Sequence, residues 1–590
     1  MMHSRNRRPV RRRTREGVTR PVVALAALLA LAVLAGCGTG NTGVAGVPTQ
    51  SGEANSGVAG VRNPSDEPGG TLRLLAGEID SLDPQRSYVP GVWNLMRLYA
   101  RTLVTWSTEP GNTDELVPDL ATDLGTTTDG GRTWTYTLRE GVRFETGRPI
   151  TSRDVKYGIE RSFASDVVVG GPTYVVDLLD DRADPYAGPY QDETPDRLGL
   201  PAIATPDDRT IVFTLTTPTP DFPFVLALPS SSPVPAENDT AGSYGADPIS
   251  SGPYAVTSVD PQTGVVLERN PEWDPATDDV RTALPDRVVV RSGLSSLARD
   301  QALLAGSADI DLSGSGVQEA TTARLVDRGL GGRIDDVTTG SLRLLALPTT
   351  VAPMDNAECR AAVAAVVDRR EVQEALGGAG NVVRTSTLWP RALDGGPDEA
   401  DAEPDLATAR EKLASCGHPN GFSTVFAVPD VPTIVEMAGV VAAQLAEVGI
   451  QAEVRPLDPA TYYATDIGNR DAVTAGGYGL VLATWTADFP TPASFLVPLV
   501  DGRSLRPVGN TNYARLDDPQ VNGLVDAARA AAEPAIAADA WRQVVRAVDQ
   551  TFTYVPLAEN RVQLLAGQRL RNGLVMQPYG GYDVATAGVR

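Results

Sequence analysis

Two patterns of hydrophobic and polar residues alternate along this chain of 590 residues. In short runs such as 71–75, 134–138, 212–215 and 265–267, β-branched, aromatic and aliphatic residues stand together or alternate with polar ones, which predicts strands. Longer stretches repeat apolar residues every three or four positions, which predicts helices with one buried face. The two patterns are interleaved from residue 71 onward. This order favours α/β lobes over an all-α or all-β fold.

The helix patterns are clearest in the second half of the chain. Small and branched apolar residues predict one helix from about residue 356 to about residue 376. Two further helix patterns are followed by Gly417 and Gly449, and glycine commonly ends helices. No segment repeats at a period of about 20–50 residues, so a solenoid or propeller is not expected. The other predicted elements are a helix that begins in 151–154 and runs to 163, helices at about 406–415, 433–448, 521–532 and 537–551, and strands at 451–455 and 554–557.

The N-terminal segment has the pattern of an export signal. Residues 1–20 contain eight arginines and one acid, Glu16, and an uncharged run follows from 21 to 36. This run is shorter than the roughly 20 residues of a membrane-spanning helix but suits a signal peptide. A single-pass membrane anchor is the alternative. The sequence Leu34-Ala35-Gly36-Cys37 resembles a bacterial lipobox, which implies a signal peptide over 1–36 and a lipid on the Cys37 thiol.

The segment that follows Cys37 is rich in Gly, Ser, Thr, Asn and Pro, and the pentapeptide GVAGV occurs at both 43–47 and 57–61. Such a composition buries little apolar surface, so a flexible tether is predicted over residues 37–69. Lipid and tether together predict a globular body held at the outer face of the cytoplasmic membrane. Arginine is frequent and lysine rare, which indicates a GC-rich genome and, with the lipobox, an actinobacterium.

The charge and the scarcity of histidine exclude several functions. The chain has 51 Lys and Arg against 74 Asp and Glu, a net charge of −23, which argues against nucleic acid as a partner. Its two histidines, His3 and His418, nearly exclude a Ser-His-Asp triad or a multi-histidine metal site. No metal, no cofactor and no catalytic residue is therefore predicted. A surface hydrolase with paired carboxylates is the enzyme alternative, and no GxSxG, CxxC, SxxK or P-loop motif supports it.

Several blocks of the body occur in the order of a known family. These blocks are LVPDLA at 116–121, LREGVRF at 138–144, GRPITSRDV at 147–155, SGPY at 251–254, ERNPEW at 268–273, LAGSADI at 304–310 and CRAAV to VDR at 359–369. With these blocks the chain resembles the extracellular solute-binding proteins of family 5, the peptide/nickel-type receptors of ABC importers, over roughly residues 70–585.

The resemblance implies a two-lobed α/β clamshell of the periplasmic-binding-protein type (type II, class C) with an inserted domain. Lobe 1 would comprise 70–108, 205–335 and 560–590, the inserted domain 109–204, and lobe 2 336–559. The lobes would close on a solute, and the closed form would deliver it to a membrane permease with its ATPase. A monomer without enzymatic activity is implied. A solute-sensing lipoprotein is the alternative that the sequence leaves open.

One loop resembles the ligand loop of the family's peptide receptors. Residues 483–495 read ATWTADFPTPASF, which is similar to a W-x-x-D-[YF]-x-x-P pattern whose Asp pairs with the peptide ammonium. The resemblance implies that Asp488 binds the ligand ammonium and that Trp485 forms an aromatic wall. The alternative is that Asp488 caps a turn before Pro490 and that Trp485 is a core residue.

Three further aromatic residues are candidates for the cleft wall. The resemblance implies that Tyr88 lies where the family's first strand leaves its lobe and lines the cleft, whereas Tyr478 lies among glycines at 476–479 and Trp389 precedes a proline. Core packing or an ordinary loop is the alternative for each. The chain departs from some peptide receptors because 471–484 contain no arginine to bind a ligand carboxylate. An oligosaccharide, haem or a chelated metal is therefore kept as alternative cargo.

Two cysteines remain in the exported body, Cys359 and Cys416. An oxidising compartment permits a disulfide between them, and this bond is predicted. Two buried thiols in separate helices are the alternative.

Overall fold

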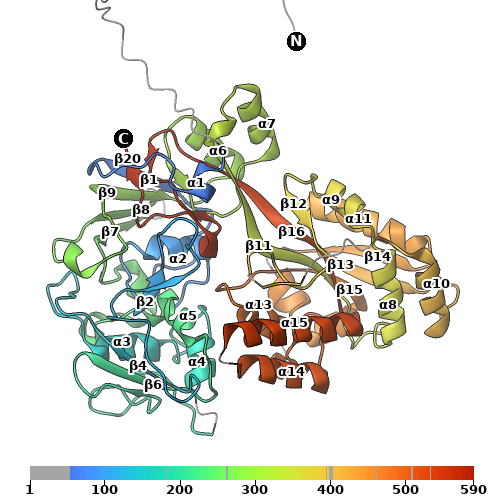
Figure 1. Cartoon of the computed structure of the whole chain (residues 1–590), viewed down its shortest axis with the longest axis horizontal. Helices are drawn as coiled ribbons and strands as arrows, with labels where there is room; N and C mark the ends of the chain where they lie inside the picture. Colours follow the sequence, from blue (N-terminus) through green and yellow to red (C-terminus); the bar gives the residue numbers. More distant parts are fainter. Residues whose placement is uncertain are drawn as a thin grey trace, which may run out of the picture. The chain divides into compact units, whose positions relative to one another are not determined.

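The computed structural model describes residues 54–180, 183–260, 264–393, 395–397, 403–459, 461–506, 509–531 and 533–590. These residues belong to one unit, which is shown in Figure 1. The predicted signal peptide and lipidation site at Cys37 lie outside the described residues. Within the described part of the chain, no helix combines the length and the apolar character needed to cross a membrane.

The first lobe is organised by a five-stranded sheet with the order β10-β1-β9-β8-β7. Strand β1, the second in this order, has Leu72 and Leu74 on the buried face and Arg73 exposed, which is the alternation predicted for 71–75. β1 runs parallel to β9 and β10, whereas β8 is antiparallel to both β9 and β7. The strands are β1 (Thr71–Leu75), β7 (Tyr254–Asp260), β8 (Gly264–Arg269), β9 (Arg287–Arg291) and β10 (Ile310–Asp311), and the helices of this part are α2 (Pro90–Met96), α6 (Ser296–Leu304) and α7 (Glu319–Asp327).

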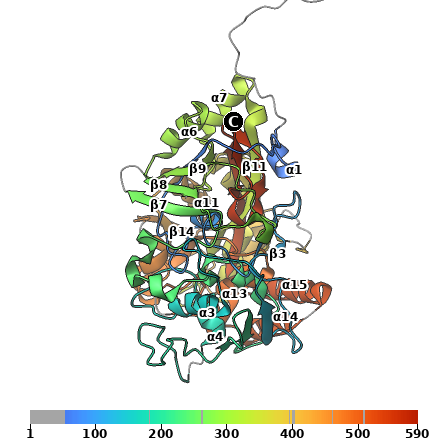
Figure 2. The ribbon, with the colours of Figure 1, turned by 90° about the vertical axis from the view of Figure 1, so that its left-hand side faces the viewer.

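Residues from the predicted inserted domain pack onto the same hydrophobic core as this sheet. Helix α3 (Ser152–Arg161) begins with a capping box formed by Thr151 and Asp154, as the polar residues at 151–154 predicted. In Figure 1 and Figure 2 the five-stranded sheet lies at one end of the lobe and α3 and α4 lie at the other. The remaining elements are β2 (Val104–Trp106), β3 (Leu116–Pro118), β4 (Thr133–Thr137), α4 (Tyr174–Leu179), β5 (Ile203–Ala204), β6 (Thr210–Thr214) and α5 (Phe222–Leu226).

The second lobe is a six-stranded sheet, ordered β12-β16-β11-β15-β13-β14, between two layers of helices. One hydrophobic cluster contains residues of α13, α14 and α15, and another contains residues of α8, α9, α10 and α11. The strands are β11 (Ile334–Ala346), β12 (Val382–Arg384), β13 (Ser423–Pro429), β14 (Gln451–Leu457), β15 (Tyr478–Trp485) and β16 (Tyr554–Leu565), and the helices include α8 (Ala357–Val366), α9 (Arg369–Ala375), α10 (Leu406–Ser415), α11 (Pro432–Ala446), α12 (Arg470–Gly476), α13 (Pro492–Val500), α14 (Pro519–Arg529) and α15 (Pro534–Thr551).

Strands β11 and β16 connect the two lobes. They pair antiparallel along almost their whole length, from Ile334 opposite Leu565 to Ala346 opposite Tyr554. Ile334 and Leu565 pack with β1 and α6 of the first lobe, whereas Leu342 and Tyr554 belong to the core of the second. The register of the pairing shifts twice between the two ends, between Thr338 and Leu342 and between Arg343 and Leu344. This ribbon, seen between the lobes in Figure 1, is therefore the hinge.

The helix predicted from 356 to 376 is wrong in one respect, because the chain forms two helices there. Helix α8 ends at Val366, and Val367 is extended. The Asp368 side chain then accepts a hydrogen bond from the amide of Arg370 at 2.8 Å and begins α9. A capping carboxylate competes with helix continuation, and here it starts a new helix in another direction.

The prediction of a flexible tether is wrong for residues 55–69, which pack onto the body. Arg62 is buried and donates from Nε and Nη2 to the Asp335 carboxylate at 3.0 and 2.9 Å. The amide of Gly57, in the short helix α1 (Ser56–Ala59), donates to the same carboxylate at 2.9 Å. A buried carboxylate needs such partners, so one arginine outweighs the Gly- and Ser-rich composition around it. The segment is thereby attached to the first-lobe end of β11.

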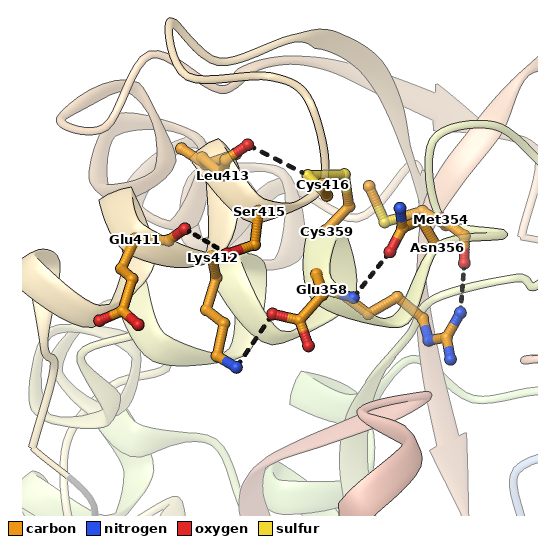
Figure 3. The surroundings of a disulfide bond; sticks show 10 residues. Met354, Asn356, Glu358, Cys359, Glu411, Lys412, Leu413, Ser415 and Cys416 are labelled. Atoms are coloured by element: carbon orange, nitrogen blue, oxygen red, sulfur yellow. Dashed lines mark hydrogen bonds and ion pairs between the residues drawn. A yellow bond between two sulfur atoms is a disulfide. The ribbon is translucent and has the colours of Figure 1, made fainter.

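Cys359 and Cys416 form a disulfide in the structure, shown in Figure 3. Cys359 lies in α8, and Cys416 directly follows α10, with 5.5 Å between the two Cα atoms. Beside the bond, Lys412 of α10 pairs with Glu358 of α8 at 3.0 Å. The bond closes a 57-residue separation and joins two neighbouring helices of the second lobe.

Candidate ligand-binding site

A cavity of about 730 Å³ lies between the lobes. Its volume falls within the roughly 300–1,000 Å³ that is typical of small-molecule sites. From the first lobe it is lined by Val89 and Trp93 around the start of α2, and by Tyr579 near the C-terminus. From the second lobe it is lined by the loop 486–490 that follows β15, and by Arg343 of the hinge. Both lobes therefore contribute walls to one cavity.

A second cavity of about 370 Å³ adjoins the first through Phe489, which lines both. Its walls include Tyr88 and Tyr174 from the first lobe, and Trp485 and Trp541 from the second. This smaller cavity is consequently the more aromatic of the two.

Asp488 joins the linings of the two cavities. Its Oδ2 accepts a hydrogen bond from the Tyr88 hydroxyl at 2.6 Å and another from the Tyr174 hydroxyl at 2.5 Å. Tyr88 lies two residues before the start of α2, Tyr174 is the first residue of α4, and Asp488 lies on the loop between β15 and α13. The Tyr88 ring stacks on Trp93, with 5.5 Å between ring centroids, which orients its hydroxyl. One carboxylate of the second lobe thus holds two phenols of the first.

The Asp488 carboxylate keeps unused hydrogen-bonding capacity. Both phenols bind Oδ2, and Oδ1 has no partner among the described residues. No described Lys, Arg or His forms an ion pair with this carboxylate. Burial raises the pKa of Asp488, and the two phenolic hydrogen bonds offset that increase only in part. Burial and the nearby Asp488 charge also raise the pKa values of Tyr88 and Tyr174, so both phenols stay protonated and donate. The site favours a cation that can donate hydrogen bonds to Oδ1.

Phe489 fixes the loop that carries Asp488. Its side chain is buried, packs edge-on against Tyr174 at 5.3 Å and stacks with Phe224 of α5 at 5.9 Å. It belongs to the hydrophobic core of the first lobe although its chain segment comes from the second. Arg506 and Asp177 form a further contact between the lobes at 3.5 Å.

The structure brings three of the five predicted ligand residues to the cavities, namely Asp488, Tyr88 and Trp485. The hydrogen bonds found for the Asp488 side chain come from phenols and not from backbone amides, so the turn-capping alternative is not supported. Trp485 is half-buried, donates from Nε1 to the carbonyl of Phe495 at 2.9 Å, and lines the smaller cavity. Trp485 therefore lines a cavity, as predicted, and is also partly packed in the core, as the alternative held.

Trp389 is not a cleft residue, contrary to the prediction. Its indole is 3% exposed, packs in the core of the second lobe and donates from Nε1 to the carbonyl of Leu393 at 2.9 Å. The turn that this hydrogen bond closes directs Pro390 and Leu393 to the large cavity instead.

Tyr478 also lies outside both cavity linings, contrary to the prediction. It is the first residue of β15, whereas Trp485 is the last, so the two lie at opposite ends of an eight-residue strand. Its ring is buried beneath the Arg455 guanidinium at 5.9 Å. The glycines around it shape the turn from α12 into β15 and leave it far from the lobe interface.

Sequence reasoning did not identify Tyr174, Phe489 or Arg343 as site residues. Tyr174 stands 314 residues from Asp488, and nothing local distinguishes its helix. The sequence does contain a signal for Arg343, because it is the lone charge in the otherwise apolar run 342–347. In the sheet Arg343 lies opposite Thr484, so an arginine on the neighbouring strand reaches the region where 471–484 have none.

Comparisons with known proteins agree with this geometry. Residues 115–505 match the model of bacterial extracellular solute-binding proteins, family 5. A solved structure of clavulanic acid biosynthesis oligopeptide binding protein 2 is 42% identical, with a TM-score of 0.89, and covers 92% of this chain and 100% of that one. Heme-binding protein A of Haemophilus influenzae is 25% identical over 80% of this chain and 84% of that protein. Peptide transport periplasmic protein SapA of Salmonella typhimurium is 23% identical over 88% of this chain and 91% of that protein.

Proposed function

The chain belongs to the bacterial extracellular solute-binding proteins of family 5, and from this premise we propose that it is the lipid-anchored peptide receptor of an ABC importer. The family binds solutes for transport and is not a family of enzymes. In this role the chain encloses a short peptide between its lobes and delivers it to a membrane permease.

The observation that carries the proposal is the Asp488 carboxylate on the wall of the interlobe cavity. It is desolvated, has no cationic partner among the described residues and keeps Oδ1 free of hydrogen bonds. A primary ammonium supplies the missing charge and up to three donors, and a charge-assisted hydrogen bond is strong where water is scarce. The α-ammonium of a peptide is such a group.

The same contacts link binding to closure. Asp488 moves with the second lobe, and its phenolic partners Tyr88 and Tyr174 belong to the first. A ligand that contacts both walls of the cavity lowers the free energy of the closed arrangement relative to the open one. It therefore shifts the population toward closure about the β11–β16 hinge. A closed receptor is the form that the permease would recognise.

Relatives support a peptide as the cargo, and one relative supports a second candidate. Two of the proteins compared above are named for oligopeptide binding and peptide transport, and a third is named for haem. His418 is the only histidine of the described chain, and it contacts Phe422 away from both cavity linings. A histidine-ligated haem in the interlobe cavity is therefore the weaker candidate.

The anchor is a separate part of the proposal. Lipid on Cys37 would hold the protein at the outer face of the cytoplasmic membrane, as is consistent with the periplasmic location in the names of relatives. The full chain, produced in a host that processes lipoproteins, is expected to yield a mature N-terminal peptide that begins with a diacylglyceryl-modified Cys37. Mass spectrometry of that peptide tests this, and an unmodified or uncleaved N-terminus would refute the anchor.

The binding proposal is tested by native mass spectrometry of the mature protein with separate pools of tripeptides, oligosaccharides and haem. A complex with peptides alone is the expected result. A complex with oligosaccharide or haem, and none with peptides, would reject the peptide assignment while leaving the receptor fold intact.

Peptide affinity should decrease as the pH falls below neutral. An ammonium binds the ionised form of Asp488, so protons compete with the ligand, and a raised pKa brings this competition above the ordinary carboxyl range. The peptide ammonium itself has a pKa of about 8 and therefore stays charged at every acidic pH. Titration calorimetry at pH 6.5, 5.5 and 4.5 should show weaker binding at the acidic end of the series than at pH 6.5. Affinity that is constant or rises over this range would contradict the assigned role of Asp488.

A further inference from the structure

Arg343 lines the same 730 Å³ cavity as Asp488. It lies in β11, opposite Thr484 of β15 on one side and Ala558 of β16 on the other. Its Nε donates to Oδ1 of Asn560 at 2.8 Å, which holds the plane of the guanidinium beside the hinge. This arginine therefore lies on a hinge strand that lines the cavity, beside a shift in the pairing register between Arg343 and Leu344.

The charge of Arg343 is not neutralised by the protein. It forms no ion pair with any carboxylate of the described chain, and Nη1 and Nη2 have no hydrogen-bond partner there. Burial lowers its pKa, and the one opposing electrostatic effect comes from the Tyr463 phenol. Desolvating a cation without a counter-charge is costly unless a ligand supplies that charge.

Arg561 provides the contrast within the same cavity. It also lines the cavity, but its Nε donates to Asp336 at 2.5 Å, so its charge is balanced. The other carboxylates of the lining besides Asp488 are Asp114 and Glu319, and neither forms an ion pair with Arg343. Arg343 is thus the cation of this lining that has no ion pair among the described residues, and Asp488 lines the same cavity.

A guanidinium held through Nε presents its two terminal nitrogens as a fork that matches the two oxygens of a carboxylate. Asn560 fixes the fork, because it accepts from Arg343 and its own Nδ2 donates to Ser341 at 3.3 Å. Oligosaccharides without acidic groups and simple amines carry no anionic group that could pair with the two terminal nitrogens of the guanidinium. An anionic group on the ligand is required to use it.

We propose that Arg343, positioned by Asn560, binds the carboxylate of the same solute whose ammonium binds Asp488. The ligand class is then a zwitterion with separated charges, such as a short peptide with a free C-terminus. The inference rests on the proposed function and adds the second end of the ligand. It also explains how this chain can bind a peptide carboxylate without an arginine in 471–484.

The test compares tripeptides that carry a free C-terminal carboxylate with the same tripeptides amidated at that end. Both pools have the same N-terminal ammonium, so the Asp488 contact is common to them. The mature protein is expected to bind the free acids about tenfold or more tightly than the amides. Arg343→Gln should bind both pools alike, at the affinity that the wild-type protein shows for the amides.

Arg561→Gln is the matched control, because it removes the same charge from the same cavity where Asp336 already balances it. It should keep the preference for free acids. Arg343→Lys, which keeps the charge and loses the fork, should restore part of the preference. Thermal melting without peptide checks that Arg343→Gln is folded.

The outcomes separate the two proposals. Equal binding of acids and amides by the wild-type protein would overturn the Arg343 site and leave peptide binding in place. A preference that survives Arg343→Gln would overturn it equally. If neither pool binds to the folded wild-type protein, both proposals fail.

Discussion

Asp488→Asn should weaken peptide binding by about thirtyfold or more, which corresponds to roughly 2 kcal/mol. Asparagine has nearly the same shape, so the two tyrosine hydroxyls keep a carbonyl oxygen to bind. What is lost is the negative charge of a half-buried carboxylate, and no second described carboxylate binds the same two phenolic hydroxyls. Titration calorimetry with the tripeptide pool at pH 7.5 measures the change.

Asp177→Asn is the control for that experiment. Asp177 also lies where the lobes meet, but Arg506 pairs with it at 3.5 Å and Thr173 donates to it at 2.9 Å. Because it is exposed and already has a cationic partner, its removal should change affinity by less than about threefold. If both variants lost affinity equally, general charge at the interface and not Asp488 would be responsible.

Removal of the Cys359–Cys416 disulfide should lower the free energy of unfolding of the second lobe by about 4 kcal/mol. The chain-entropy model gives this value for a closed loop of 57 residues, because the bond restricts the unfolded chain. Cys359 is fully buried, so alanine is the suitable replacement at both positions. Urea unfolding of Cys359→Ala/Cys416→Ala against the wild-type protein measures the loss.

Reduction offers an independent check on the same number. Dithiothreitol should destabilise the wild-type protein by a similar amount and leave the double variant unchanged. Peptide affinity should stay the same in every case, since α8 and α10 contribute no residue to either cavity lining. Free thiols in non-reducing peptide mapping, or an equally stable double variant, would contradict the prediction.

The sequence predicts well what depends on local pattern. The apolar alternation of 71–75 and the helix pattern of 406–415 reappear as β1 and α10, because each exposes one face to a single core. Family blocks in order extended this to the two-lobed fold, which the match to residues 115–505 and the solved relative support. The loop sequence around Asp488 predicts it as a ligand residue in the same way, and the structure places it in the lining of the larger cavity.

Local sequence patterns do not predict the contacts between segments that are distant along the chain. Tyr174 acquires its role only because α4 is folded against a loop 314 residues away. Arg62 lies in a stretch whose composition predicts disorder, yet a single buried carboxylate, Asp335, fixes it. Trp389 shows the converse, since an aromatic residue near a cleft is directed inward by one hydrogen bond of its own turn. Side-chain direction at such positions is decided by tertiary packing.

The central claim is that Asp488 binds the ammonium of the solute, and the most direct measurement changes the ligand and not the protein. Tripeptides with a free N-terminus and the same tripeptides acetylated at that end should be compared by titration calorimetry with the mature protein at pH 7.5. Acetylation removes the positive charge and leaves the rest of the peptide intact. The free peptides are expected to bind at least tenfold more tightly, and this preference should disappear in Asp488→Asn. Equal affinity for free and acetylated peptides in the wild-type protein would contradict the account.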